Sequence, residues 1–178
     1  TDKTKLLLLS HVETVTGLRM PIKEISNIAR SKGILFIVDG AQAPGMININ
    51  VHDLGCDVYA FSGHKWVMGP KETGIVYIRK SIQNKVNNVF LSGGYSSYSR
   101  SSGTRNAPNI IGFGDIMDWH EKIGKDRIEN RCLDLARYCQ NHLKTIKGLK
   151  VITSDVPELS TAIVSVSLDN ISNREVFN

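Results

Sequence analysis

Several features that would place the chain in a specialised class are scarce among its 178 residues. The three cysteines, Cys56, Cys132 and Cys139, are odd in number and lack C-x-x-C spacing, so we expect neither a disulfide framework nor a thiolate metal site. They are better explained as small core residues than as nucleophiles. The apolar run at residues 6–9 is too short to cross a bilayer, and no secretory signal pattern opens the sequence. We therefore expect a protein of the reducing cytoplasm without a membrane span.

The charge balance is mildly basic but carries no signature of a polyanion partner. Lysine and arginine number 22 and aspartate and glutamate 17, which gives a net charge of +5. Aromatic residues make up only 7% of the chain, and no lysine- and arginine-rich block occurs, so nucleic-acid binding is not expected. With 41% apolar and 22% charged residues, the composition is that of an ordinary globular protein. A metal site is not expected either, because no paired ligands accompany His52, His120 or His142.

Apolar segments rich in valine and isoleucine alternate with segments of helical period in the first half of the chain. This alternation predicts an α/β fold with three layers, a mostly parallel sheet with helices on both faces. The expected strands are residues 5–12, 34–38, 58–61 and 74–79, the last antiparallel because the connection before it is short. A helix is expected after Pro21, with one apolar face, and a single helical turn at residues 51–54. That face is formed by Ile22, Ile25, Ile28 and Ala29.

The second half begins with a long loop and then becomes helical. Residues 92–109 carry Gly, Ser, Tyr and Asn without periodicity, and a loop of this length is typical of a functional or disordered segment. Helices are expected at residues 110–123 and 126–146, and strands at residues 151–153 and 162–168. One face of the second helix is expected to hold Ile128, Leu135, Cys139 and Leu143. A last helix is expected to start at Ser172, with Glu175 completing a capping box.

Two strand ends deliver ionisable groups to the edge at which an open α/β sheet binds ligands. Asp39 lies just past the strand at residues 34–38, and residues 62–65, Ser-Gly-His-Lys, end the next strand. Only one short crossover separates the two strands, so they are expected to be neighbours. Asp39 and Lys65 are therefore predicted to face one pocket.

A carboxylate and an amine in one such pocket suit pyridoxal phosphate. The amine forms a Schiff base, and the carboxylate keeps the pyridine nitrogen protonated so that the ring accepts electrons released at the substrate's α-carbon. Once displaced by the substrate's amine, the lysine is a base close to that carbon. Taken alone, Asp39 has a simpler interpretation as a turn or helix cap and Lys65 as part of a solvated loop. Their combination favours a cofactor site.

Residues 38–43, VDGAQA, and residues 61–66, FSGHKW, resemble the class V aminotransferase family of fold-type I pyridoxal phosphate enzymes. That family includes cysteine desulfurases, selenocysteine lyases and isopenicillin N epimerase-like proteins. The resemblance covers roughly residues 5–150, and the ordered set of motifs is more specific than any one of them. The further matches are residues 10–12, 16–17, 69–74 and 102–106.

The resemblance implies a role for four residues around the cofactor ring. Lys65 would hold pyridoxal 5'-phosphate as an internal aldimine, and Asp39 would pair with the pyridinium nitrogen. Gln42 would hydrogen-bond the phenolic oxygen. Thr14 stands where the desulfurases have an asparagine near the same oxygen, and its hydroxyl can still donate there.

The resemblance also implies contacts to the cofactor's phosphate. Ser62 and His64 match family positions that contact it, and Thr104 matches one that reaches the phosphate of the neighbouring subunit. That last match implies a homodimer. His11 has an equally good interpretation as a partly buried, hydrogen-bonded histidine, so it is not among the predicted site residues.

The family pattern implies two domains, a partial cofactor-binding large domain over residues 1–150 and the start of a truncated C-terminal small domain over residues 151–178. The chain lacks the family's upstream phosphate-cradling turn and ring-stacking residue. It also lacks the downstream arginine for the substrate carboxylate and the desulfurases' catalytic cysteine. We therefore expect a piece of a longer protein that does not turn over substrate by itself.

The substrate implied is an amino acid, with desulfuration, deselenation, epimerisation and transamination left open. Trp66, the Pro70-Lys71 pair and the Thr104-Arg105 pair favour the epimerase-like branch. The competing hypothesis is a non-catalytic relative that serves as a binding module. The presence of both Asp39 and Lys65 argues against it, because a protein without the chemistry does not need them.

Overall fold

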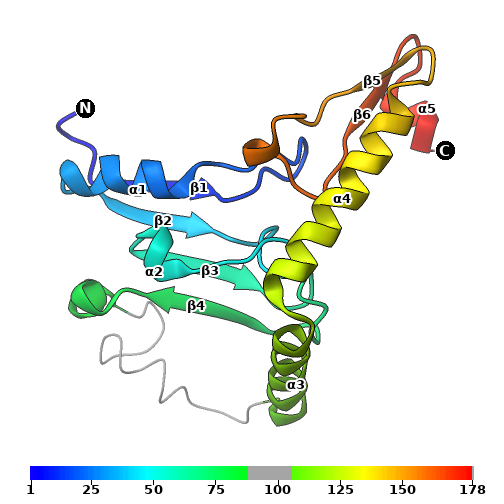
Figure 1. Ribbon diagram of the computed structural model, residues 1–178. Helices are drawn as coiled ribbons and strands as arrows, with labels where there is room; N and C mark the ends of the chain where they lie inside the picture. The colour runs from blue at the N-terminus through cyan, green and yellow to red at the C-terminus, as the bar shows by residue number, and fades with distance from the viewer. Residues whose placement is uncertain (88–105, 178) are drawn as a thin grey trace.

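The computed structural model describes residues 1–87 and 106–177 (Figure 1). A four-stranded sheet lies at its centre, in the order β1 (Leu6–Ser10), β2 (Leu35–Asp39), β3 (Val58–Ser62) and β4 (Gly74–Ile78). Strands β1, β2 and β3 are parallel, and β4 is antiparallel to β3. The predicted mostly parallel α/β sheet is therefore confirmed, with small shifts of the strand ends.

Two early helices follow the predicted pattern. Helix α1 (Ile22–Ser31) begins after Pro21, and α2 (Val51–Leu54) is the predicted single turn. The side chain of Asn50 caps α2 by accepting backbone hydrogen bonds, and the turn ends at Gly55, whose φ of 73° suits glycine. A 3-10 turn, η1 (Lys80–Lys85), follows β4.

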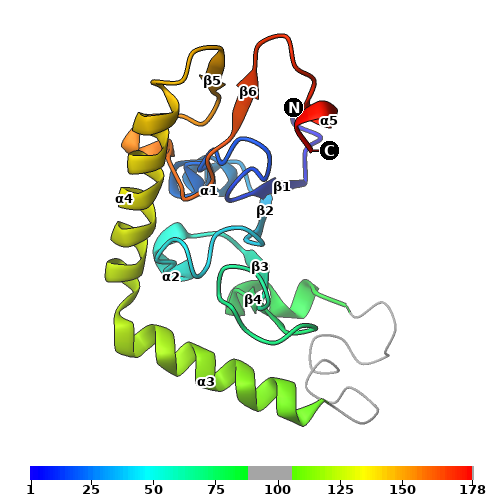
Figure 2. The same cartoon turned by 90° about the vertical axis from the view of Figure 1, so that its right-hand side faces the viewer.

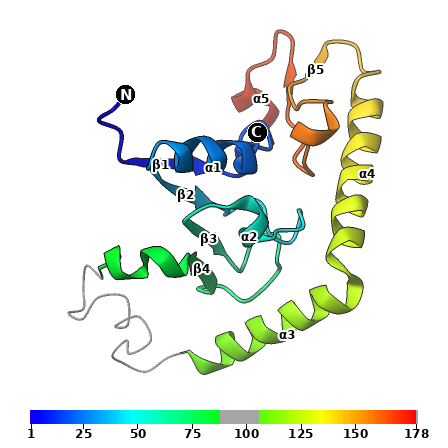
Figure 3. The ribbon, with the colours of Figure 1, turned by 60° about the vertical axis from the view of Figure 1, so that its left-hand side comes forward.

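Two longer helices, α3 (Ala107–Ile123) and α4 (Lys125–Leu143), meet at a sharp corner (Figure 3). Gly124 forms that corner with a φ of 94°, a backbone conformation that favours glycine. The predicted loop therefore ends earlier than expected, because the side chain of Asn106 caps a helix that already begins at Ala107. The rest of that loop, residues 88–105, lies outside the described residues.

A small sheet of β5 (Leu149–Val151) and β6 (Val166–Leu168) lies beyond the end of α4 that is far from α3 (Figure 2). Strand β6 is shorter than predicted because residues 161–163 bond elsewhere, and β5 has its predicted length but lies two residues earlier in the chain. Thr161 donates from its hydroxyl to the carbonyl of Gly17 at 2.8 Å instead of joining the ladder. A 3-10 turn, η3 (Pro157–Leu159), lies between the strands, and the predicted Ser172–Glu175 capping box opens α5 (Asn173–Phe177).

The main core lies on one face of the four-stranded sheet. Phe36 and Val38 of β2 and Tyr59 of β3 point to this face and pack with Ile22 and Ala29 of α1. On the opposite face, Leu6 and Leu8 of β1 stay 49% and 59% exposed. Over the described residues, helices therefore cover one face, and the second helical layer stays a prediction. No helix in the described ranges is long and apolar enough to span a membrane.

Two predicted apolar faces were wrong in part. Ile28 of α1 is 59% exposed, because the buried positions follow Ile22, Ser26 and Ala29, and Ile28 lies to the side of that row. On α4, Leu135 and Cys139 are exposed, and their neighbours Ala136 and Gln140 are buried instead. The face of α4 is rotated by one residue because it packs on segments distant in sequence, which its own periodicity does not reveal. Ala136 and Gln140 line a small cavity together with Asp155, Pro157 and Ser160.

Candidate functional site

The carboxyl ends of β1, β2 and β3 meet at one edge of the sheet, and all the predicted site residues that the structure describes lie at these strand ends or in the segments that follow them. Ser10, Asp39 and Ala60 are partners in register across the three strands. Asp39 is exposed, and its Oδ1 accepts a hydrogen bond from the Ala41 amide at 2.8 Å. This bond turns the chain directly after β2 and holds the carboxylate at the sheet edge.

Gln42 is tied to the segment that carries Lys65. Its Oε1 accepts a hydrogen bond from the indole Nε1 of Trp66 at 3.0 Å. Because the amide oxygen is engaged by this donor, the amide NH₂ group of Gln42 is left to donate elsewhere. The bond therefore joins the loops after β2 and β3 and orients Gln42 as a hydrogen-bond donor.

Residues 62–69 form a tight turn after β3. The Gly63 amide donates to the carbonyl of Thr73 at 2.8 Å, and the Gly69 amide donates back to the carbonyl of Gly63 at 2.8 Å. A β-carbon at Gly63 would overlap the Thr73 hydroxyl, so the turn has no room for a larger residue. His64 and Lys65 stand exposed on the outside of this turn, and Ser62 is half-buried at the end of β3.

Thr14 lies in the turn after β1. The carboxylate of Glu13 accepts hydrogen bonds from the amides of Val15 and Thr16, at 3.0 and 2.7 Å, and these bonds hold the pKa of Glu13 below its usual range. Gly17 closes the turn with a φ of 73°. Thr14 is exposed at its tip, on the same edge of the sheet as Asp39.

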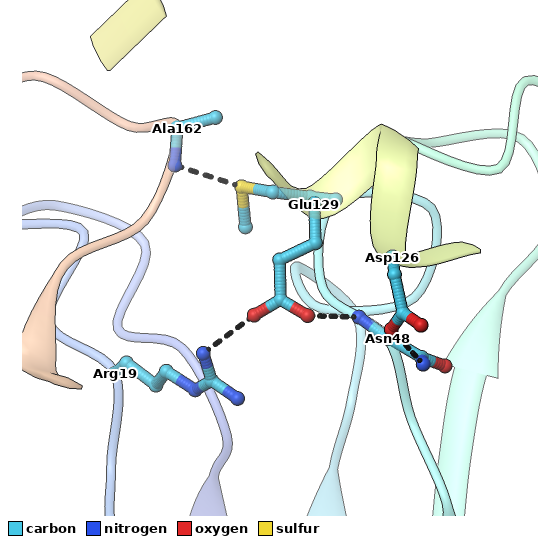
Figure 4. Close-up of polar contacts among 6 residues, drawn as sticks. Arg19, Asn48, Asp126, Glu129 and Ala162 are labelled. Atoms are coloured by element: carbon cyan, nitrogen blue, oxygen red, sulfur yellow. Dashed lines mark hydrogen bonds and ion pairs between the residues drawn. The ribbon is translucent and has the colours of Figure 1, made fainter. Parts of the chain in front are cut away.

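The turn after β1 is fixed from outside by α4 (Figure 4). Arg19 pairs with Glu129 of α4 at 2.8 Å, and the other oxygen of Glu129 accepts from the Asn48 amide at 3.0 Å. The Asn48 side chain donates to Asp126 at 2.8 Å. One acidic face of α4 therefore anchors the loops that follow β1 and β2, which carry Thr14 and Gln42.

The structure thus brings six predicted residues to one edge of the sheet, from three successive parallel strands. Between Asp39 and Lys65 themselves, no ion pair is formed in the described part of the chain. The individual cofactor contacts stay predictions. Thr104 lies outside the described residues. The six are Thr14, Asp39, Gln42, Ser62, His64 and Lys65.

An apolar cavity of about 320 Å³ lies elsewhere, between the helix-covered face of the sheet and the α3–α4 corner. Tyr77 of β4, Met117 of α3 and Ile128 of α4 are among its lining residues. None of the six predicted residues lines it. The predicted site residues that the structure describes therefore lie at the exposed sheet edge and not in this cavity.

The interpretation of His11 as a hydrogen-bonded histidine is confirmed, although it is more deeply buried than expected, and sequence reasoning missed its partner Tyr59. His11 follows β1 and is 2% exposed, and its Nδ1 lies 3.0 Å from the hydroxyl oxygen of Tyr59 in β3. Burial and the neighbouring Arg19 lower the pKa of His11 to about 4. The position of His11 at a strand end was visible in the sequence, but its partner was not.

A carboxylate and an amine near the ends of adjacent parallel strands are typical of α/β folds that bind a ligand at this edge of the sheet. Comparison with known protein families identifies the family. The chain belongs to the class-V aminotransferase family, whose model matches residues 1–178. Enzymes of this family depend on pyridoxal phosphate. The resemblance inferred from residues 38–43 and 61–66 is therefore confirmed.

Similar proteins include both branches that the sequence left open. A probable cysteine desulfurase of Halalkalibacterium halodurans is 33% identical over 98% of this chain and 45% of its own length. An isopenicillin N epimerase of Amycolatopsis lactamdurans is 30% identical over 93% of this chain and 46% of its own length. The solved apo structure of a cysteine desulfurase from Thermococcus onnurineus superposes with a TM-score of 0.83 at 27% identity, over 97% of this chain and 46% of that one. The chain spans about half the length of these relatives.

The donor set at the sheet edge fits pyridoxal phosphate. An exposed amine, an exposed carboxylate with one oxygen engaged by Ala41, and an oriented amide donor at Gln42 match the cofactor's aldehyde, pyridine nitrogen and phenolic oxygen.

Proposed function

We propose that the protein is a pyridoxal phosphate enzyme that acts at the α-carbon or β-position of an amino acid. The observation that carries this proposal is the pairing of strand ends. Asp39 is the last residue of β2, Lys65 lies shortly after the adjacent parallel strand β3, and the 3.0 Å bond between Gln42 and Trp66 ties the two segments together. An acid and an amine are thereby held at one edge of one sheet.

Each residue has a role that follows from its chemistry. Bound pyridoxal phosphate supplies an electron-accepting ring for the breaking of a bond at the substrate's α-carbon. Lys65 holds the cofactor covalently through Nζ and, when released, moves a proton at that carbon. Asp39 keeps the pyridine nitrogen protonated by ion pairing. Gln42 and Thr14 donate hydrogen bonds to the phenolic oxygen.

The phosphate contacts imply a second subunit. In this proposal Ser62 and His64 bind the phosphate of their own site, and Thr104 reaches the phosphate of a neighbouring copy. The active form is then a homodimer. Residues 1–150 belong to the large domain, with helices over both faces of its sheet, and residues 151–178 begin the small domain. The three free cysteines suit a reducing cytoplasm.

Two groups of reactions are the candidates. The first is desulfuration or deselenation, and the second is epimerisation or transamination. Thr14, in place of the desulfurases' asparagine, together with Trp66, favours the epimerase-like branch. The similarity to desulfurases and to isopenicillin N epimerases keeps both reaction types under consideration. The competing function is a non-catalytic binding module, which the joint presence of Asp39 and Lys65 disfavours.

Borohydride reduction tests the central assignment. The protein, expressed at its natural length and loaded with pyridoxal phosphate, is expected to be yellow and to carry the reduced cofactor on Lys65 by mass spectrometry. Lys65→Ala removes the adduct, and Lys71→Ala, a matched exposed lysine on the same connection, retains it. An adduct on another lysine, or none, refutes the assignment.

Substrate assays decide the reaction. Sulfide release from cysteine and selenide release from selenocysteine, both with an added dithiol as reductant, are measured in parallel with keto-acid formation from alanine with an acceptor and loss of chirality in a single-enantiomer amino acid. Turnover in none of them, together with intact cofactor binding, favours the non-catalytic relative.

A further inference from the structure

A buried histidine–tyrosine pair lies directly behind the strand end that carries Asp39. His11 and Tyr59 are 2% and 1% exposed, and Nδ1 of His11 lies 3.0 Å from the Tyr59 hydroxyl oxygen. The rings meet edge to face, with centroids 5.9 Å apart and planes at 86°. The proposed function assigns no role to either residue.

The pair reaches across β2 from the strands on either side. Tyr59 is the register partner of Val38, one residue before Asp39. A β-carbon at Gly40 would overlap the Tyr59 ring, so the ring lies against the backbone just after Asp39. The tyrosine thus passes under the end of β2 and meets His11, which follows β1.

Backbone hydrogen bonds hold the same residues of β2 from both sides. The His11 amide donates to the Asp39 carbonyl at 2.8 Å, and the Gly40 amide donates to the Ala60 carbonyl at 2.7 Å. The side-chain bond between His11 and Tyr59 joins the two flanking strands to each other. The peptide units around Asp39 are therefore enclosed by a ring of contacts.

Both members of the pair are neutral at physiological pH. Burial and Arg19 lower the pKa of His11 to about 4, and burial raises the pKa of the Tyr59 hydroxyl. A buried hydrogen bond between neutral groups is costly to break, because each group then stays without a partner away from water. The contact is therefore suited to a fixed structural element.

We propose that His11 and Tyr59 are positioning residues for Asp39. The hydrogen bond between His11 and Tyr59 braces the ends of β1, β2 and β3 and thereby fixes the direction of the Asp39 carboxylate. The carboxylate is exposed, and its one bond within the described residues is to the Ala41 amide, so its direction depends on the backbone of residues 39–41. This inference rests on the proposed role of Asp39 as partner of the cofactor's pyridine nitrogen. Without the brace, the ion pair to that nitrogen is expected to weaken.

Amide hydrogen exchange tests the brace without any cofactor. In the cofactor-free protein at its natural length, Tyr59→Phe is expected to speed exchange at Gly40 and Ala41 about fivefold, the loss of one hydrogen bond. Tyr77→Phe is the matched control, since Tyr77 is the register partner of Tyr59 on β4. Equal exchange rates at Gly40 and Ala41 in all three proteins overturn the brace.

A double-mutant cycle tests the link to Asp39. The dissociation constant for pyridoxal phosphate is measured in a Lys65→Ala background, so that covalent attachment does not mask weaker contacts. Tyr59→Phe is expected to weaken binding about fivefold when Asp39 is present and less than about twofold in the Asp39→Asn background. A general loss of packing would give equal effects in both backgrounds, and that result overturns the positioning role.

If Tyr59→Phe does not fold, a second pair of variants, at His11, tests the same bond. His11→Asn keeps a polar partner near the Tyr59 hydroxyl and is expected to retain cofactor affinity, whereas His11→Leu is expected to reproduce the loss. Equal affinities for these two variants count against the brace. If Asp39→Asn has no effect on affinity, the proposed role of Asp39 fails, and the exchange rates alone decide whether the brace exists.

Discussion

The buried state of His11 predicts how the stability of the protein depends on pH. The pKa of His11 in the folded protein is about 4, against an ordinary value of 6.5, because of burial and Arg19. Between these two pH values the unfolded chain therefore binds a proton at His11 that the folded protein does not bind. The stabilisation is fully present above pH 6.5 and is lost as the pH falls toward 4.

The magnitude follows from the same two values. A fall in pKa from 6.5 to about 4 corresponds to about 3 kcal/mol, at about 1.4 kcal/mol for each tenfold change. Acidification from pH 7 to pH 4.5 covers most of this range, so the titration of His11 is expected to lower the free energy of unfolding by about 2 kcal/mol over that interval.

Urea unfolding followed by fluorescence measures this loss in the wild type and in His11→Asn. Carboxylates that titrate in the same range are common to both proteins, so the difference between the two pH curves isolates His11. His142→Asn, at an exposed position on α4, controls for the removal of a histidine. Parallel curves for the wild type and His11→Asn between pH 7 and pH 4.5 would refute the argument from burial.

Three further predictions concern packing, anchoring and chemistry. Gly40→Ala forces a β-carbon against the Tyr59 ring and is expected to destabilise the fold by about 2 kcal/mol. Gly114→Ala, in open space on α3, is the control and is expected to stabilise the fold by up to about 1 kcal/mol. Thermal denaturation compares the two variants, and equal shifts of the melting temperature contradict the predicted overlap at Gly40. Glu129→Gln breaks the partly buried pair with Arg19 and is expected to cost about 1 kcal/mol by urea unfolding, with the exposed pair partner Asp134→Asn as a control near zero. Asp39→Asn is expected to keep some cofactor bound through Lys65 but to slow turnover about a hundredfold, the loss of a charged hydrogen bond; unchanged turnover in a steady-state assay would disprove the electron-sink role.

The sequence predicted the sheet well because its signals are local. The runs at residues 34–38 and 58–61 are short, apolar and bounded by glycine or charge, and the strands form there. Asp39 and Lys65 could be assigned to one edge because the order of parallel strands follows from short crossovers. The family motifs then supplied their chemistry.

The remaining features depend on contacts between distant parts of the chain. The buried positions of α4 are Ala136 and Gln140 and not the apolar Leu135 that its periodicity selects, and Glu129 of the same helix contacts the distant Asn48 segment. The bond from His11 to Tyr59 links residues on strands separated by β2, and neither residue type demands the other. Local pattern cannot choose among such partners, so the brace and the anchoring of the site loops required the structure.

The turn that holds Thr14 is completed by residues from the opposite end of the chain. The Thr153 hydroxyl donates to the carbonyl of Thr16 and the Thr161 hydroxyl to that of Gly17, contacts that close loops of well over a hundred residues. Such contacts form late in folding, because the entropy lost in closing the loop must be met first. During synthesis the ribosome releases β1 long before Thr161, so the turn that carries Thr14 acquires its final shape only when translation has passed that point.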